Sequence, residues 1–379
     1  MNIVLWGTCD TNKPRIRILR DGLRAHGAEI IEVHAPVWEG VEDKSSLGGM
    51  GEWASRVLRL IVVYPRLIWR YLRAPAHDLV LVSYPGQLDV LIIRLFAWVR
   101  RKPVAFDWFI SIYDTVVNDR RILDRRNPLA WMLWVSEWLA VRAANFSFMD
   151  TATHARRMED LFGMTPGSLG HVWVGAEARF FQSGYIQRLR QGNRLSVLFY
   201  GQFIPLHGID TIIEAARLTR DEPIRWILVG RGQEAPRIRD TLERDPLPNL
   251  EWLDWVAYEQ LPDKIARADI CLGIFGTSGK ASSVIPNKVF QIVAAGRPLI
   301  TRDSAAIREL LDEARPCTTL VEAGNALALA EAVRRHLSEG TRAQRRLRCH
   351  AHIADQIDST AIGRQFDALV KARLHLITG

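Results

Sequence analysis

The polar residues best suited to chemistry lie in one loop-to-helix segment near residue 280. A Gly- and Ser-rich loop over 276–283 precedes Pro286, a residue suited to the first turn of a helix. The apolar segment that follows ends at Gly296, and a strand is expected next. Such a loop and helix start direct backbone N–H groups at one point, where Lys280 and Lys288 add positive charge. The segment therefore predicts a binding site for a phosphate or diphosphate.

Two more glycine-bearing turns follow predicted strands in the same half of the chain. One strand leads into Gly201 and Gln202, and the next leads into Gly230 and Arg231. A lone Gly-x-Gly turn is weak support for phosphate binding, because many strand-to-helix turns contain glycine. Its value here comes from its position in order between the two other segments.

In combination these segments resemble the donor-binding half of retaining GT-B glycosyltransferases of the family-4 type. The run from Ser283 to Pro298 is similar to a family pattern of Glu, seven residues and Glu, followed by small apolar residues and Gly-x-Pro. The block 144–181 adds a further match at the end of the first half, so that the resemblance covers roughly residues 140–315. It implies two Rossmann-like domains, with the nucleotide-sugar bound by the second.

Four positions depart from the family pattern. Gln202 stands where arginine is usual and His207 where lysine is usual, and both still donate hydrogen bonds. Of these two, only a protonated His207 would add positive charge. The alternative to a phosphate-binding role for His207 is that of a solvated polar residue at the start of a helix. Ser283 and Gln291 replace the two glutamates; the Gln291 carbonyl still accepts a ribose hydroxyl, whereas Ser283 cannot act as a carboxylate. The resemblance implies that the donor diphosphate itself helps to deprotonate the acceptor, so this loss does not exclude catalysis.

The resemblance implies the following site residues. The backbone at Val256 pairs with the base, and Trp255 stacks on it unless it is a core or interface residue. The expected donor-binding residues are Gly201, Gln202, Gly230, Arg231, Trp255, Val256, Lys280, Ser282, Ser283, Asn287 and Gln291. The expected catalytic residues are Asp107, His207 and Lys288. Arg231 is either a phosphate ligand or a solvated side chain. No Asp-x-Asp metal motif is present, so neither an essential metal nor a cofactor is expected.

Candidates on the acceptor side follow predicted strands in the first half of the chain. In open α/β sheets, ligands meet the carboxyl ends of the strands. Thr8, Tyr84, Gln87 and Asp114 are therefore acceptor-side candidates beside Asp107. For both carboxylates, a capping or loop-forming role is the alternative.

An arginine-rich helix is predicted over residues 53–73. At about 100° per residue, its arginines fall within an arc of roughly 100°. They are Arg56, Arg59, Arg66, Arg70 and Arg73. Most of the remaining circumference is apolar and includes Trp69, and Pro65 is expected to kink or divide the helix. We predict an element on an anionic membrane surface, bound through Arg59, Arg66, Trp69, Arg70 and Arg73. The alternative is a helix that fills a crevice, with its arginines solvated.

Composition sets the remaining limits. The 379 residues suffice for two domains, and 48% hydrophobic and 24% charged residues are typical of a globular protein. The net charge is +8, and residues 51–102 hold nine Arg and Lys against three Asp and Glu. Nucleic acid is not an expected partner, because no recognised binding module accompanies this charge. Four widely separated cysteines are expected to be reduced thiols in a cytosolic protein, without a signal peptide or a membrane-spanning segment.

Short β-branched runs alternate with longer amphipathic segments, which indicates parallel sheets in an α/β fold. The expected strands are 2–6, 29–33, 79–83, 104–106 and 146–149, then 196–200, 225–229, 250–253, 270–274, 299–301 and 318–321. We expect an acceptor domain over 1–180 that includes a C-terminal helix from about 356, and a nucleotide-sugar domain over 190–355.

The sequence thus predicts a GT-B glycosyltransferase that moves a sugar, with retention, from a nucleotide-diphosphate sugar to an acceptor. The basic helix alone suggests a lipid-linked acceptor and a place at the cytoplasmic face of the inner membrane. Two alternatives remain open: a nucleotide-sugar epimerase of the same fold, and a non-catalytic donor-binding partner of another transferase.

Overall fold

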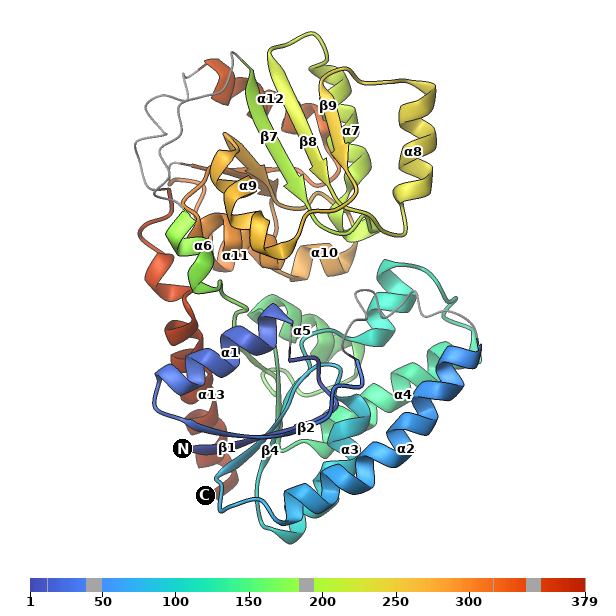
Figure 1. Ribbon diagram of the computed structural model, residues 1–379, viewed down its shortest axis with the longest axis vertical. Helices are drawn as coiled ribbons and strands as arrows, with labels where there is room; N and C mark the ends of the chain where they lie inside the picture. Colours follow the sequence, from blue (N-terminus) through green and yellow to red (C-terminus); the bar gives the residue numbers. More distant parts are fainter. Residues whose placement is uncertain (12, 39–49, 184–193, 316, 339–348, 379) are drawn as a thin grey trace. The chain divides into compact units, whose positions relative to one another are not determined.

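The chain divides into two compact units, residues 1–174 with 359–379, and residues 175–358. The computed structural model describes residues 1–11, 13–38, 50–183, 194–315, 317–338 and 349–378, with the backbone alone for 50–58, 183, 338 and 376–378 (Figure 1). The first unit ends at 174 rather than at the predicted 180, and the second begins at 175 rather than 190.

The first unit is built on a six-stranded parallel sheet in the order β2-β1-β3-β4-β5-β6. Its strands are β1 (Asn2–Gly7), β2 (Glu29–His34), β3 (Leu79–Val82), β4 (Val104–Asp107), β5 (Phe146–Met149) and β6 (Gly170–His171). All residues of β3, β4 and β5 are buried, as expected for parallel strands covered on both faces. The five strands predicted for this half are confirmed; β6 has only two residues and carries no periodicity to predict it.

Helices cover both faces of this sheet. They are α1 (Pro14–Ala25), α2 (Met50–Leu72), α3 (Gln87–Val99), α4 (Pro128–Ala143), α5 (Ala152–Leu161) and α13 (Ser359–Thr378), with a π-helical turn η1 (Asp114–Asp119). Figure 1 shows α13 beside α1, and their close approach depends on two glycines. A Cβ on Gly22 would lie 1.9 Å from the Ser359 carbonyl oxygen, and one on Gly363 would lie 2.2 Å from the Gly22 oxygen. The C-terminal helix therefore packs into the first unit.

The second unit repeats the architecture with the sheet order β12-β11-β10-β7-β8-β9, again all parallel. Its strands are β7 (Leu195–Tyr200), β8 (Ile224–Val229), β9 (Leu250–Leu253), β10 (Ile270–Leu272), β11 (Leu299–Arg302) and β12 (Thr318–Val321). The helices are α6 (Ala178–Ser183), α7 (Ile209–Leu218), α8 (Ala235–Arg244), α9 (Leu261–Arg267), α10 (Gly279–Ser283), α11 (Asn287–Ala294) and α12 (Ala326–Ser338), with 3₁₀ turns η2 (Pro205–His207), η3 (Tyr258–Gln260), η4 (Ile307–Glu309) and η6 (Ala354–Gln356). The prediction of a second parallel sheet is confirmed.

Helix α2 packs one face on the first sheet and continues through Pro65 without a break. Tyr64, Leu67 and Tyr71 form the buried face and join the core of the first unit. Pro65 and Ile61 are both exposed, so water can satisfy the Ile61 carbonyl that lacks an N–H partner. Of the two effects expected of Pro65, kinking or dividing the helix, division is excluded.

The arginine stripe of α2 is not uniform. Arg70 is partly buried and donates to the carbonyl oxygens of Glu32 (3.1 Å) and His34 (3.2 Å) on β2, so it belongs to the packing of the helix. Arg70 lies three residues after the buried Leu67, at the margin of the packed face. The other predicted membrane-surface arginines, Arg59, Arg66 and Arg73, are exposed; the Arg56 side chain lies outside the described residues.

Among the described residues, no helix combines the length and the apolar character needed to cross a membrane.

Two of the four cysteines form a disulfide. Cys317, just before β12, is bonded to Cys349, and the two residues are 32 positions apart in the sequence. Cys9 and Cys271 are free and buried. The prediction of four reduced thiols is therefore wrong for this pair. The pairing depends on the fold of the second unit and leaves no spacing motif in the sequence.

Candidate donor site in the second unit

Three predicted segments meet where neighbouring parallel strands end. β7 lies between β10 and β8, and β9 follows β8, so Gly201, Gly230 and Trp255 come after adjacent strands. Gly201 N–H donates to the Val229 carbonyl (2.9 Å), and Gly230 N–H donates to the Leu253 carbonyl (2.9 Å). A Cβ on Gly230, which has φ 154°, would lie 1.9 Å from the Gly201 oxygen. Glycine is required here because the two turns touch.

Lys288, in the first turn of α11, reaches toward the same turn. Its side chain is 5% exposed, and its Nζ lies 3.6 Å from the centroid of the Phe199 ring. Nζ is buried and has no hydrogen-bond partner among the described residues. Burial lowers the pKa of Lys288 well below its ordinary value, because desolvation penalises the ammonium. A Cβ on Gly201 would lie 2.9 Å from Nζ, so glycine leaves room for the amine.

His207 borders the same turn from η2. Its Nδ1 is hydrogen-bonded to the Gln202 carbonyl, and since a carbonyl only accepts, the neutral ring carries its proton on Nδ1. A Cβ on Gly201 would meet the ring at Cε1, 3.2 Å away. His207 is 8% exposed and packs edge-on to Phe199. The structure thus brings His207 and Lys288 together around Gly201, as the sequence predicts for two members of one site.

Gln291 lies in a continuous chain of hydrogen bonds. Tyr200 Oη donates to Gln291 Oε1 (2.9 Å), and Gln291 Nε2 donates to Tyr258 Oη (3.2 Å). Tyr258 Oη in turn donates to Glu177 Oε2. The predicted ribose contact can use only the second lone pair of Oε1, since Tyr200 occupies the first. Sequence reasoning missed Tyr200, Tyr258 and Glu177, which carry no motif and meet only in the fold.

The predicted Gly- and Ser-rich loop contains the short helix α10. Ser278 caps it by accepting a hydrogen bond from Ala281 N–H (3.1 Å). Lys280 is 7% exposed and Ser283 is 2% exposed, and the Ser283 hydroxyl donates to the Lys280 carbonyl (3.0 Å). The prediction of an irregular loop is wrong here, because the Ser278 cap nucleates a helical turn.

The remaining members of this segment lie nearer the surface. Ser282 Oγ donates to the Gly279 carbonyl (2.7 Å), and Asn287, the first residue of α11, is half-buried. Neither side chain is as fully buried as that of Ser283.

Arg231 and Trp255 form the outer part of the site. The Arg231 guanidinium lies 5.0 Å from the centroid of the Trp255 ring, a cation–π pair. Trp255 is 57% exposed, so it is no core residue. Val256, beside it, is half-buried. An exposed indole at the end of β9 offers a flat face for a nucleotide base.

Asp107 and Asp114 of the first unit are buried and paired. Both carboxylate oxygens of Asp107 accept from Arg15 (3.0 and 3.1 Å), and burial raises the Asp107 pKa more than Arg15 lowers it. Asp114 accepts from Arg157 (2.6 Å) and from Asn118 (2.7 Å). Both carboxylates therefore have a cationic side-chain partner within the first unit.

The other acceptor-side candidates also have internal partners. Thr8 N–H donates to Asp89 (2.7 Å), and Tyr84 packs edge-on to Phe109. Gln87 Nε2 donates to Glu137 (2.9 Å).

Glu137 is a buried carboxylate that sequence reasoning missed. It lies on α4 and organises the segment after β4. It accepts from Gln87 Nε2, Trp108 Nε1, Ser111 Oγ, Ile112 N and Tyr113 N at 2.6–3.3 Å. Burial raises its pKa, and these donors offset part of that shift. The only sign in the sequence that Glu137 organises this segment is that it is a single acidic residue in a helix rich in Trp and Leu.

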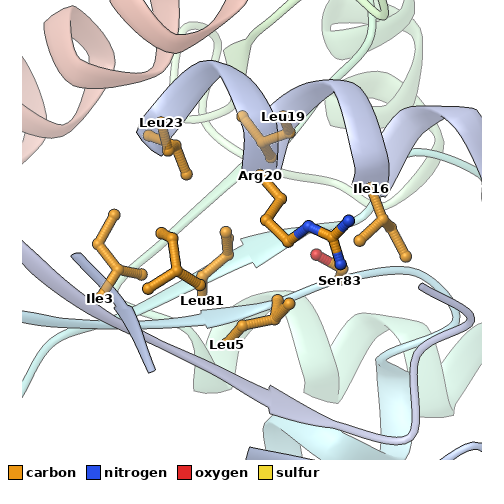
Figure 2. A pocket seen from close by; sticks show the side chains of 9 residues that line it. Ile3, Leu5, Ile16, Leu19, Arg20, Leu23, Leu81 and Ser83 are labelled. Carbon is orange, nitrogen blue, oxygen red and sulfur yellow. The ribbon is translucent and has the colours of Figure 1, made fainter. Parts of the chain in front are cut away.

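A pocket in the first unit lies beneath α1 (Figure 2). It is lined by aliphatic side chains of α1, β1, β2 and β3, with Arg20 and Ser83 as its polar members. This lining suits packing and not a diphosphate. Among the described residues, no group of His, Cys, Asp and Glu could hold a metal ion.

Comparisons with known proteins show what the second unit and the whole fold are similar to. Residues 194–339 match the family of glycosyl transferases group 1. WcaI of Escherichia coli (strain K12), assigned to glycosyl transfer in colanic acid biosynthesis, is 30% identical over 104 residues. That match spans 27% of this chain and a quarter (25%) of the length of WcaI.

Solved structures resemble the whole chain. Sucrose-phosphate synthase of Thermosynechococcus elongatus has a TM-score of 0.70 at 13% identity and covers 99% of each chain. Anabaena HepE in complex with UDP-glucose has a TM-score of 0.66 at 14% identity and covers 98% of this chain and 100% of its own. At these identities the likeness shows the fold, and the predicted GT-B architecture is confirmed.

Proposed function

We propose that this chain, whose second unit is a group 1 glycosyltransferase domain in a GT-B fold, moves a sugar from a nucleotide-diphosphate sugar to an acceptor with retention of configuration. The observation that carries the proposal is the buried Lys288 amine beside Gly201, which has no hydrogen-bond partner in the described part of the chain. A buried ammonium needs a counter-charge, and a diphosphate supplies one. UDP is the first donor nucleotide to test, since HepE has been solved with UDP-glucose.

Each donor-site residue has a distinct role in this proposal. Lys288 and a protonated His207 stabilise the diphosphate as it leaves, when its charge increases. The exposed face of Trp255 stacks on the base, and Arg231 holds the indole from its other side. Gln291 binds a ribose hydroxyl through its remaining lone pair. The donor diphosphate takes the acceptor proton, so no protein carboxylate is needed at Ser283.

The reaction needs neither a metal nor a cofactor in this scheme, because lysine, histidine and arginine supply the positive charge. Asp107 is left out of the chemistry, since both its oxygens are occupied by Arg15. The acceptor is proposed to be a lipid-linked glycan or glycolipid. The exposed arginines of α2 support this, since they suit the headgroup layer in which such an acceptor lies.

The test is a transfer assay with radiolabelled UDP-sugars and a membrane extract. Label in the lipid fraction that depends on the protein is the expected result. It should fall about 100-fold for Lys288→Met and stay unchanged for Lys264→Met on α9, because one charged contact to phosphate is worth about 3 kcal/mol. Interconversion of the free donor would indicate an epimerase, and UDP binding without transfer would indicate a non-catalytic partner; either result overturns the proposal.

A further inference from the structure

The exposed apolar side chains of this protein gather on one part of the first unit. Among the described residues, sixteen large apolar side chains are exposed, and thirteen of them lie between residues 61 and 139. They are Ile61, Val62, Trp69 and Leu72 on α2, Leu88, Leu95, Trp98 and Val99 on α3, Leu129, Trp131, Met132 and Leu139 on α4, and Ile122 before α4. Single exposed apolar residues scattered over a surface are normal, but the concentration of exposed apolar side chains on three helices is typical of an interaction surface.

These three helices are neighbours. Helix α3 packs against both α2 and α4, and Figure 1 shows the three grouped together in the first unit. On α3, Leu88, Leu95 and Val99 follow one another at helical spacing, so they form a stripe on its outer side. We call the exposed side chains of these helices the α2–α3–α4 face. It extends well beyond the basic helix that the sequence analysis selected.

The α2–α3–α4 face and its flanking loops expose mostly positive charge. Its helices and their flanking loops expose Arg59, Arg66, Arg73, Arg101, Arg121, Arg125, Arg126 and Arg142. The carboxylates of α3 and α4, Asp89 and Glu137, are buried. Among the described side chains of the three helices, none is an exposed acid; Asp78 and Asp124 are exposed in the loops. The partner of this face must therefore bring both negative charge and an apolar layer.

Tryptophan and arginine lie together on this face. Trp98 is 67% exposed and Trp131 is 65% exposed. The Arg73 guanidinium lies 4.0 Å from the centroid of the Trp69 ring, and Arg142 lies 4.0 Å from that of Trp138. Indoles favour the boundary between headgroups and acyl chains, and arginine pairs with phosphate at that depth. The chemistry of both residue types points to the same depth of a lipid layer.

We propose that the α2–α3–α4 face docks on an anionic bilayer, with Trp98 and Trp131 inserted and the arginines on lipid phosphates. A second copy of the chain fits less well, because a two-fold contact would bring like arginines together, and the described side chains of these helices include no exposed acid to pair them. The inference deepens the proposed function on its acceptor side. It would place the first unit at the surface that holds a lipid-linked sugar.

The experiment is co-sedimentation of the full chain with phosphatidylcholine vesicles, with and without phosphatidylglycerol. The wild type should bind the anionic vesicles, with affinity that falls as salt increases. Trp98→Ser with Trp131→Ser should weaken binding at least about tenfold, because two indoles leave the apolar layer. Arg66→Glu with Arg73→Glu should abolish binding to the anionic vesicles. Leu218→Ser with Leu327→Ser, at exposed positions of the second unit, should change nothing.

Two results would overturn the inference. One is equal sedimentation of the tryptophan variant and the wild type. The other is a dimer in gel filtration that the tryptophan substitutions dissociate, with no vesicle binding by the wild type. UDP binding is read separately by calorimetry, so loss of membrane docking and failure of the donor site are distinguishable. The three double variants alter exposed side chains, so their folding is not at risk.

Discussion

The Nζ of Lys288 lies 3.6 Å from the centroid of the Phe199 ring, and among the described residues it has no hydrogen-bond partner. An aromatic face attracts an ammonium, but it does not replace the hydration that burial removes. In the free protein, burial therefore disfavours the charged form of this amine, which lies at the end of β7 beside the Gly201 turn. A diphosphate bound at that turn would favour the ammonium, and this links the buried lysine to the proposed donor.

Lys288→Met should stabilise the free protein at neutral pH by about 1–3 kcal/mol, because it removes a buried amine that has no hydrogen-bond partner among the described residues. Burial lowers the pKa of Lys288 in the folded state below its ordinary value of 10.5. Between the folded-state pKa and 10.5, the unfolded chain therefore binds more protons than the folded chain. Wild-type stability should therefore rise with pH across that window, and the gain from Lys288→Met should shrink. Urea unfolding at several pH values from neutral to about pH 10 measures the free energy of unfolding of the wild type and the gain from Lys288→Met. Lys264→Met is the control. A gain that does not depend on pH would contradict this explanation.

Gln291→Glu, which restores the family's carboxylate, should destabilise the protein by about 1–3 kcal/mol. Tyr258 has one hydroxyl proton, which it donates to Glu177, so a second carboxylate at position 291 would have no donor from Tyr258. The double variant with Glu177→Gln should recover most of the loss, since Tyr258 can then donate to position 291. Thermal unfolding of the two single variants and the double variant tests this coupling. If the stability losses of the two single variants simply added in the double variant, the hydrogen bonds through Tyr258 would not explain why position 291 is glutamine.

The fold follows from the sequence more completely than the site does. Short strands such as Phe146–Met149 alternate with longer amphipathic helices, a pattern typical of parallel α/β sheets, and turn glycines such as Gly230 mark close backbone contacts. Lys288 and His207 were selected from the sequence because Lys288 follows the Gly- and Ser-rich loop and His207 precedes Gly208. The partners of Asp107 and Gln291 were not predictable, since Arg15 and Tyr258 reach them across long stretches of sequence. Arg70 shows the same limit, because helical spacing alone does not tell where a long side chain bends.

Cys349→Ser should lower the free energy of unfolding by about 3–4 kcal/mol, the loop-closure entropy expected for a bridge across 32 positions. The unfolded, unreduced protein should contain two titratable thiols, Cys9 and Cys271. Thiol titration in denaturant gives the number directly. Four reactive thiols in protein purified without reductant would contradict the disulfide between Cys317 and Cys349.

Glu137→Ala should destabilise the first unit by about 3–5 kcal/mol, because five donors then lose one buried carboxylate. The loss should also loosen the segment that follows β4, which these bonds hold. Urea unfolding followed by tryptophan fluorescence measures the first effect, and hydrogen exchange at Ile112 and Tyr113 measures the second. Glu29→Ala, at an exposed position in the same unit, is the matched control. Unchanged exchange at both amides would show that Glu137 does not hold this segment.

Titration calorimetry of UDP against wild type, Lys288→Met and Lys264→Met tests the central claim most directly. The claim predicts that wild type and Lys264→Met bind UDP with equal affinity, and that Lys288→Met binds about 100-fold more weakly, as loss of one charged phosphate contact requires. It further predicts that uridine, which lacks the diphosphate, does not distinguish the three proteins. Equal affinity of all three for UDP would show that the buried amine beside Gly201 does not bind the donor diphosphate.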